Sequence, residues 1–131
     1  MPNLQTLKAH AWPFYNTWRK SNGSYCPAFK SRVLVTLKAW RHITGSTGYK
    51  KRNGSDVYRR LMLIPYAKNI IEASSTIQNE TTRHGRHYFT LEAMVDVHED
   101  KKPVLRKVRV IIEEDKSGNK ILLSVMDKKQ K

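Results

Sequence analysis

The strongest constraint on the fold is a change in the spacing of apolar residues partway along the chain. From residue 89 to residue 97 every odd position is apolar, while most of the even positions are polar. This alternation is typical of a β-strand with one buried face, because successive side chains point to opposite sides. Two further strands are predicted over residues 104–112 and 120–126, after a charged loop at 98–103 and a hairpin turn at 115–119.

The first half of the chain has helical features instead. Residues 4–20 predict a helix that Pro13 either interrupts or restarts. A turn at 21–24 and a short strand at 31–36 come before a helix over residues 37–43, which Thr36 can cap. Ser55 can cap the next helix, and Pro65 fits the first turn of another one, which continues to residue 73.

Helices followed by strands indicate an α+β fold. We expect N-terminal helices packed on a small antiparallel meander of three strands, or of four if residues 76–80 join it. The length of 131 residues suits one domain. Within it, residues 1–30 form a predicted helical N-terminal extension and residues 31–127 the core.

Charge indicates the kind of partner. The formal net charge is +14, from 25 Lys and Arg against 11 Asp and Glu. Residues 1–30 contain no acidic residue, and most of the residues charged between 31 and 60 are basic. A polyanion suits such a surface, because neutralised phosphates release their condensed counterions. The alternative is a Lys-rich surface that serves solubility alone.

Composition also narrows the classes of protein. Cys26 is the single cysteine, which excludes an internal disulfide and a Cys-rich zinc site and fits a reducing compartment. No apolar run reaches the length of a membrane span, and the N-terminus does not resemble a signal peptide. Four aromatic residues between positions 12 and 18 fit core packing better than a base-stacking platform.

The motifs that are missing favour chemistry without a metal or a cofactor. The sequence contains no phosphate-binding glycine-rich loop, no His-Glu-x-x-His, and only scattered acidic residues. A protein of this kind that cleaves phosphodiesters is expected to act on RNA, whose 2′-hydroxyl is an internal nucleophile. It then needs a proton acceptor, a proton donor and cations around the transition state.

Three places offer such groups. His42 lies among basic residues, which favour the neutral imidazole that accepts a proton. Lys107 and Arg109 share one face of a predicted strand, about 7 Å apart. Ser124 is a hydroxyl among apolar residues of the last strand. For each there is a structural alternative: a packed helix end for His42, solubilising charge for the cations, and a satisfied core serine for Ser124.

The segment 83–88, Arg-His-Gly-Arg-His-Tyr, is both basic and rich in imidazole. Its two histidines are three residues apart and can approach a metal, but no third ligand is evident nearby. We interpret the segment as the approach to a hairpin that contacts a nucleic-acid backbone through Arg86 and His87.

The order of these pieces is similar to that of a known family. The pieces are Trp-Arg-His-Ile at 40–43, a helix with a Leu-x-x-Ile-Pro-like signal at 61–71, and strands containing Lys-Val-Arg-Val-Ile-Ile at 107–112 and Leu-Ser-Val at 123–125. Over residues 31–127 the chain resembles the barnase–EndoU–colicin E5/D–RelE superfamily of ribonucleases, in its phage- and toxin-associated branches.

The resemblance implies metal-independent cleavage of RNA, with tRNA favoured, on the open face of an antiparallel sheet, leaving a 2′,3′-cyclic phosphate. The family pattern matches His42 as the helical histidine, Arg109 or Lys107 as the strand cation, and Ser124 as the last-strand hydroxyl. The residues expected to bind the RNA backbone are Arg41, Lys51, Arg52, Arg59, Arg60, Arg86 and His87.

The resemblance further implies a toxin that acts in the bacterial cytoplasm, either on its own or delivered there as part of a secreted effector, and is restrained by an acidic immunity protein or antitoxin. Two other functions stay open at this point. One is a non-catalytic basic nucleic-acid-binding protein, such as a chaperone or a structural phage factor. The other is a protein-interaction module from a mobile element, whose positive charge serves an acidic partner.

Overall fold

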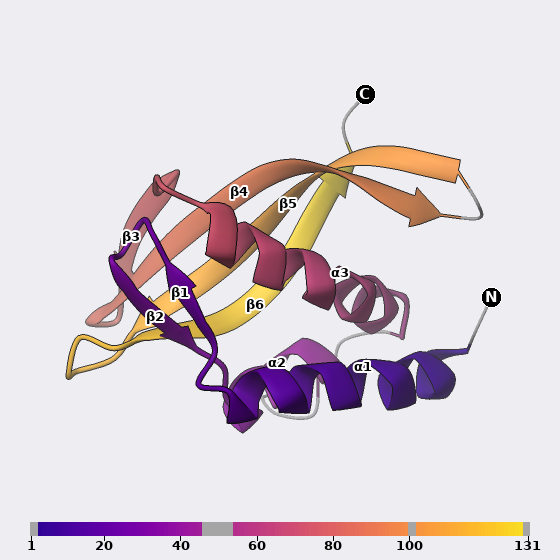
Figure 1. The fold of residues 1–131 in the computed structure, drawn as a ribbon, viewed down its shortest axis with the longest axis horizontal. Coiled ribbons are helices and arrows are strands. Elements are labelled where there is room, and N and C mark those ends of the chain that lie inside the picture. The colour runs from indigo at the N-terminus through magenta and orange to yellow at the C-terminus, as the bar shows by residue number, and fades with distance from the viewer. Residues whose placement is uncertain (1–2, 46–53, 100–101, 130–131) are drawn as a thin grey trace.

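The computed structural model describes residues 3–45, 54–99 and 102–129. In these ranges the fold is α+β, as predicted, with three helices beside a curled six-stranded mixed sheet (Figure 1). None of the helices in these ranges is long and apolar enough to cross a membrane. The elements are α1 Leu4–Lys20, β1 Ser24–Cys26, β2 Ser31–Leu34, α2 Leu37–Thr44, α3 Gly54–Ala73, β3 Asn79–Arg83, β4 Arg86–Glu99, β5 Lys102–Glu114 and β6 Lys120–Lys129.

The sheet is larger than the meander that the sequence predicted. Its strand order is β1-β2-β6-β5-β4-β3. Strands β3 to β6 do form an antiparallel meander, with β3 beginning at Asn79. The prediction was wrong at the other edge, where the β1–β2 hairpin joins the sheet and β2 runs parallel to β6. The predicted loop at 98–103 was also too long, because β4 continues to Glu99 and β5 begins at Lys102.

Gly23 allows the first hairpin to form. Its φ is +69°, and a Cβ built on it would lie 1.8 Å from the carbonyl oxygen of Val33. Only glycine tolerates both conditions without strain. The predicted turn therefore ends at Gly23, and Ser24 already belongs to β1, opposite Val33. This close contact between the two strands has no counterpart in the apolar pattern of the sequence.

Pro13 lies inside the continuous helix α1, and Pro65 lies inside the continuous helix α3. The helix interruptions predicted at these two prolines were therefore wrong. A proline removes one backbone hydrogen bond and costs roughly 3 kcal/mol in a helix interior. Each of these prolines is exposed, and buried residues lie on both sides of Pro65 in α3, from Val57 to Ile71. Burial of one face along the whole helix outweighs the local cost of the proline.

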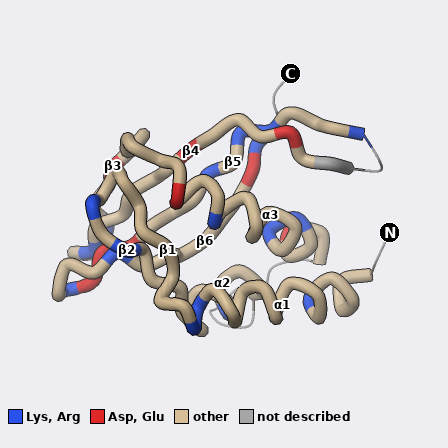
Figure 2. Tube along the Cα trace, viewed as in Figure 1, with Lys and Arg blue, Asp and Glu red and all other residues tan. Residues whose placement is uncertain are grey.

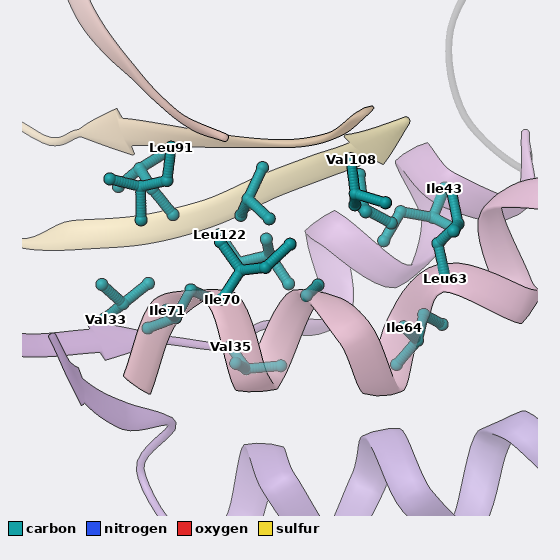
Figure 3. Close-up of a cluster of buried hydrophobic side chains, with 14 of the residues drawn as sticks. Val33, Val35, Ile43, Leu63, Ile64, Ile70, Ile71, Leu91, Val108 and Leu122 are labelled. Carbon is teal, nitrogen blue, oxygen red and sulfur yellow. The ribbon is translucent and has the colours of Figure 1, made fainter. Parts of the chain in front are cut away.

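Helix α3 lies between the sheet and α1 (Figure 1). Its buried residues pack toward strand residues such as Leu91, Val108 and Leu122, and Leu63 approaches Ile43 of α2 (Figure 3). The predicted inward residues of β5, which include Val108, are fully buried. The core therefore fills the space between α3 and one face of the sheet, which leaves the other face to carry polar groups.

Buried polar side chains tie α1 to the rest of the fold. Trp18 Nε1 donates to Ser24 Oγ at 2.9 Å, and Ser24 Oγ donates to Glu72 Oε2 at 2.6 Å. Tyr15 Oη donates to the carbonyl of Thr36 at 2.6 Å, and burial raises the pKa of the Tyr15 phenol. Tyr15 and Trp18 thus serve packing, since both are buried, and Trp12 packs against the same core, whereas Phe14 is exposed.

Charged residues of both signs occur on the long strands (Figure 2). Most acidic residues there pair with a base: Glu92 with Arg109, Glu113 with Arg86, and Asp127 with Arg106. Lys120 pairs with Glu114 and holds the pKa of the Glu114 carboxyl below its usual range. The excess positive charge of the chain therefore comes largely from basic residues outside these pairs.

Candidate active site

A cavity of about 510 Å³ lies on the open face of the sheet, which is the face turned away from α3. Side chains from β3, β4, β5 and β6 line it, and α2 contributes His42. Its position depends on the strand register. Asn79 is paired with Thr90, Thr90 with Ile111, and Ile111 with Ser124, so one row of residues crosses four strands.

Helix α2 brings His42 to the edge of this cavity. The Thr36 hydroxyl caps the helix by accepting from the amide of Ala39 at 3.2 Å, and Gly45 ends it in the left-handed conformation. Ala39 and Ile43 are buried in the core, which leaves His42 partly exposed beside β6. The cap, the buried face and the glycine stop together set the position of this imidazole.

Ser124 lies on β6 in the same cavity and is 2% exposed. Arg60 Nη1 donates to Ser124 Oγ at 2.6 Å and to the carbonyl of Val125 at 3.1 Å. Strand β2 pairs with β6 at Lys120 and Ile121. Beyond these two residues, the Arg60 side chain lies along the same edge of β6. A hydroxyl oxygen that accepts from a guanidinium keeps its own proton as a donor.

Two neighbouring arginines of α3 have different surroundings. Arg60 Nε also pairs with Asp56 at 3.1 Å, and its side chain is 12% exposed. Arg59 instead reaches Asp127 at 3.4 Å, where the buried Arg106 binds the same carboxylate at 3.2 Å. The sequence left open which of the two arginines faces the site, and the structure connects Arg60 to Ser124.

The β3–β4 hairpin supplies the cationic rim of the cavity. His84 and Gly85 form its two-residue turn with φ values of 51° and 76°, as a type I′ turn requires. Arg83 and His84 both line the cavity. A second imidazole and a guanidinium therefore share the cavity that contains His42 and Ser124.

The other lining residues carry no charge. Asn79, Thr81, Tyr88 and Thr90 form the side made by β3 and β4, which we call the neutral wall. Ile111, Leu123 and Met126 form an apolar part of the lining beside Ser124, which we call the apolar floor. The cavity thus combines imidazole, hydroxyl and guanidinium groups with a neutral surface that can hold an uncharged ring.

Lys107 and Arg109 lie on the open face, as the alternation of β5 predicted, but outside the lining of the cavity. Arg109 is opposite Met126, which does line it, and Arg109 Nε binds Glu92 Oε2 at 2.6 Å. The Arg109 side chain is 45% exposed and the Glu92 side chain is 20% exposed. Arg109 therefore adjoins the cavity as an ion-paired cation.

The remaining predicted backbone-binding residues are dispersed. Arg41 is exposed on α2, whereas Lys51 and Arg52 lie outside the described residues. Arg86 binds Glu113 at 2.6 Å, and this carboxylate raises the pKa of the Arg86 guanidinium. His87 is on the opposite face of β4, where Nε2 lies 2.6 Å from Glu80 and the ring stacks on Phe89.

Sequence reasoning missed the neutral wall and did not select Arg83 or His84 as site residues, although it singled out their segment. A signal was present, because His-Gly is a two-residue turn between strands. Placing the turn there sets Thr81 opposite Tyr88 and Asn79 opposite Thr90. The segment 79–83 was hard to identify as a strand because all five of its residues are exposed.

A second cavity, of about 410 Å³, lies between α1, α3 and β4. It is lined mainly by apolar residues such as Leu7, Phe14 and Val97, with His10 as its one imidazole. The described residues contain no cluster of three His, Cys, Asp or Glu side chains that could hold a metal. Among the cavities, the one on the open face has the groups that phosphate chemistry uses.

The chain matches no family model, no curated protein and no solved structure in comparisons of its sequence and fold.

Proposed function

We propose that this protein is a metal-independent endoribonuclease whose active site is the cavity on the open face of the sheet. One observation carries the proposal: His42 and Ser124, selected separately from the sequence, line the same cavity although they are 82 positions apart. A second imidazole, His84, lines it too. An RNA phosphodiester placed there meets a proton acceptor, a hydroxyl donor and cations.

The proposed reaction is transfer of the phosphoryl group to the neighbouring 2′-oxygen. His42 accepts the 2′-hydroxyl proton as the oxygen attacks phosphorus, and the departing 5′-oxygen takes up a proton from solvent. The products are a 2′,3′-cyclic phosphate and a free 5′-hydroxyl. The Ser124 hydroxyl donates to a non-bridging oxygen as negative charge develops there, and the Arg60 guanidinium polarises that hydroxyl from behind.

The open face supplies the cations for neighbouring phosphates. Lys107 and Arg109 project from β5 on the same side as Ile111 of the cavity. Arg83 stands at the rim. These positions suit an RNA strand that continues past the cleaved bond across the sheet, and a high net charge of +14 favours its association.

The test is incubation of the purified protein with total tRNA in excess EDTA. We expect discrete fragments with cyclic phosphate ends from the wild type and none from His42→Ala. A shift in mobility without fragments would instead identify a non-catalytic nucleic-acid-binding protein. Growth arrest on expression in bacteria, relieved by His42→Ala, would support the proposed role as a toxin that acts on cytoplasmic RNA, with tRNA the first candidate substrate.

A further inference from the structure

We propose that the neutral wall and the apolar floor of the cavity bind an unpaired nucleobase, so that the substrate is RNA in a single-stranded region or loop. This inference rests on the proposed nuclease function and names its substrate class. It starts from the unequal chemistry of the cavity. Titratable and cationic groups occupy the α2 end and the rim, while β3 and β4 present an amide and three hydroxyls.

The neutral wall has a defined geometry. Asn79 is directly opposite Thr90, and Thr81 is directly opposite Tyr88, in the register of β3 and β4. Opposite residues have Cβ atoms about 5 Å apart, and the two pairs are about 7 Å apart along the strands. The four groups therefore form a compact patch of neutral donors and acceptors, which suits the edge of a base better than a phosphate.

The apolar floor supports the same assignment. Ile111, Leu123 and Met126 are partly buried side chains that line the cavity next to Ser124. A phosphate would lose hydration against this surface without gaining hydrogen bonds, whereas the face of a base gains from leaving water. Tyr88, half-buried at the wall, adds an aromatic ring of the kind on which unpaired bases stack.

The register also places the base relative to the cleaved bond. Asn79 and Ser124 end a row of four residues on adjacent strands, so three strand spacings, about 14 Å in all, separate them. A phosphate held by Ser124 and His42 then leaves room for a neighbouring nucleoside to extend toward the wall. A base in a duplex has its edge occupied by its partner and cannot enter without unpairing.

The binding experiment uses ligands that cannot be cleaved. We titrate the full chain with each of the four nucleoside 3′-monophosphates and with inorganic phosphate, and follow backbone amide shifts by NMR. At least one nucleotide is expected to bind about tenfold or more tightly than phosphate, with shifts at residues 79–90. Asn79→Ala combined with Thr90→Val should remove this preference, whereas the control Thr82→Ala, on the opposite face of exposed β3, should preserve it.

A cleavage experiment separates this inference from the nuclease proposal. A hairpin RNA should be cut in its loop, and the Asn79→Ala, Thr90→Val variant should lose base preference there while still producing cyclic phosphate ends. Equal affinity for nucleotides and phosphate, or equal cutting of stem and loop, would overturn the base site even if cleavage persists. Base-dependent binding without any cleavage would instead overturn the nuclease function and leave the base site standing.

Discussion

Arg60 of α3 donates from Nη1 to Ser124 Oγ at 2.6 Å and to the neighbouring carbonyl of Val125 at 3.1 Å. This contact joins a helix to the part of β6 beyond its pairing with β2, 64 residues later in the sequence. It also orients the hydroxyl that the proposed reaction uses. In the proposed reaction, Arg60 acts through Ser124 as a positioning residue.

Replacing Arg60 should therefore impair catalysis more than RNA binding. For Arg60→Lys, which retains the charge but cannot span both acceptors, we expect kcat to fall by about tenfold or more with a small change in KM. Steady-state kinetics on a short RNA measure both constants. Arg59→Lys, at the adjacent position bound to Asp127, is the matched control and should retain kcat. Equal losses in the two variants would contradict the positioning role.

Ser124→Ala removes the proposed donor to the phosphate. Loss of one such donor in an active site typically reduces kcat by roughly 10²-fold or more. It also leaves an Arg60 N–H with one acceptor fewer, so the free energy of unfolding should fall by about 1–3 kcal/mol. Ser124→Thr keeps the hydroxyl and should recover part of the activity. Denaturant unfolding, measured beside the kinetics, separates the two effects.

His42→Ala should abolish most cleavage while the fold persists, because a general base contributes about 10²–10⁴-fold. The imidazole is partly exposed and lies beside, not within, the buried face of α2 formed by Ala39 and Ile43. Single-turnover assays in EDTA measure the rate, and circular dichroism checks the fold. His10→Ala, in the apolar cavity between α1 and α3, serves as the control. Undiminished cleavage by His42→Ala would remove this residue from the mechanism.

Lys107 and Arg109 are expected to bind phosphates along the open face. Each substitution by alanine should weaken RNA binding for all sequences and reduce the slope of log affinity against log salt by about one. Fluorescence anisotropy at several salt concentrations measures this slope. Lys20→Ala, at the C-terminal end of α1, is the comparison and should leave the slope nearly unchanged. An unchanged slope for both strand variants would place the RNA on another face.

The hydrogen bonds from Trp18 through Ser24 to Glu72 predict a pH-dependent contribution to stability. Lys68 and then Ser24 hold the pKa of the Glu72 carboxyl below its ordinary value of 4.5. A lowered pKa in the folded state stabilises the fold above that ordinary value, and the contribution is lost as the pH falls through the lowered pKa.

Glu72→Gln should therefore reduce the free energy of unfolding at pH 7, by less than about 1 kcal/mol because the carboxyl is partly exposed. The difference from wild type should vanish in acid, and urea unfolding between pH 7 and pH 3 measures it. Ser24→Ala, which removes the acceptor of the buried Trp18 N–H, should cost about 1–3 kcal/mol at pH 7, and most of that cost should persist in acid. A difference for Glu72→Gln that persists in acid would contradict this assignment.

The sequence by itself determined the local elements that have a strong repeating pattern. Three local features were sufficient to predict the α+β class and the positions of most elements. They are the alternation in β4 and β5, the Thr36 cap of α2, and the order of helices followed by strands. The sequence also selected His42, Lys107, Arg109 and Ser124, and the alternation of β5 put Lys107 and Arg109 on one face. These features depend on neighbours within a few residues, which a single sequence displays directly.

Only the tertiary structure decided which distant segments meet. The parallel pairing of β2 with β6, the packing of Gly23 against Val33, and the continuous course of α3 through Pro65 depend on burial over the whole fold. The tertiary structure also decided that Arg60, and not Arg59, contacts Ser124. It likewise brought the neutral wall and Ser124 into one cavity. Long-range contacts of this kind gain their free energy collectively, so no local pattern of residues encodes them.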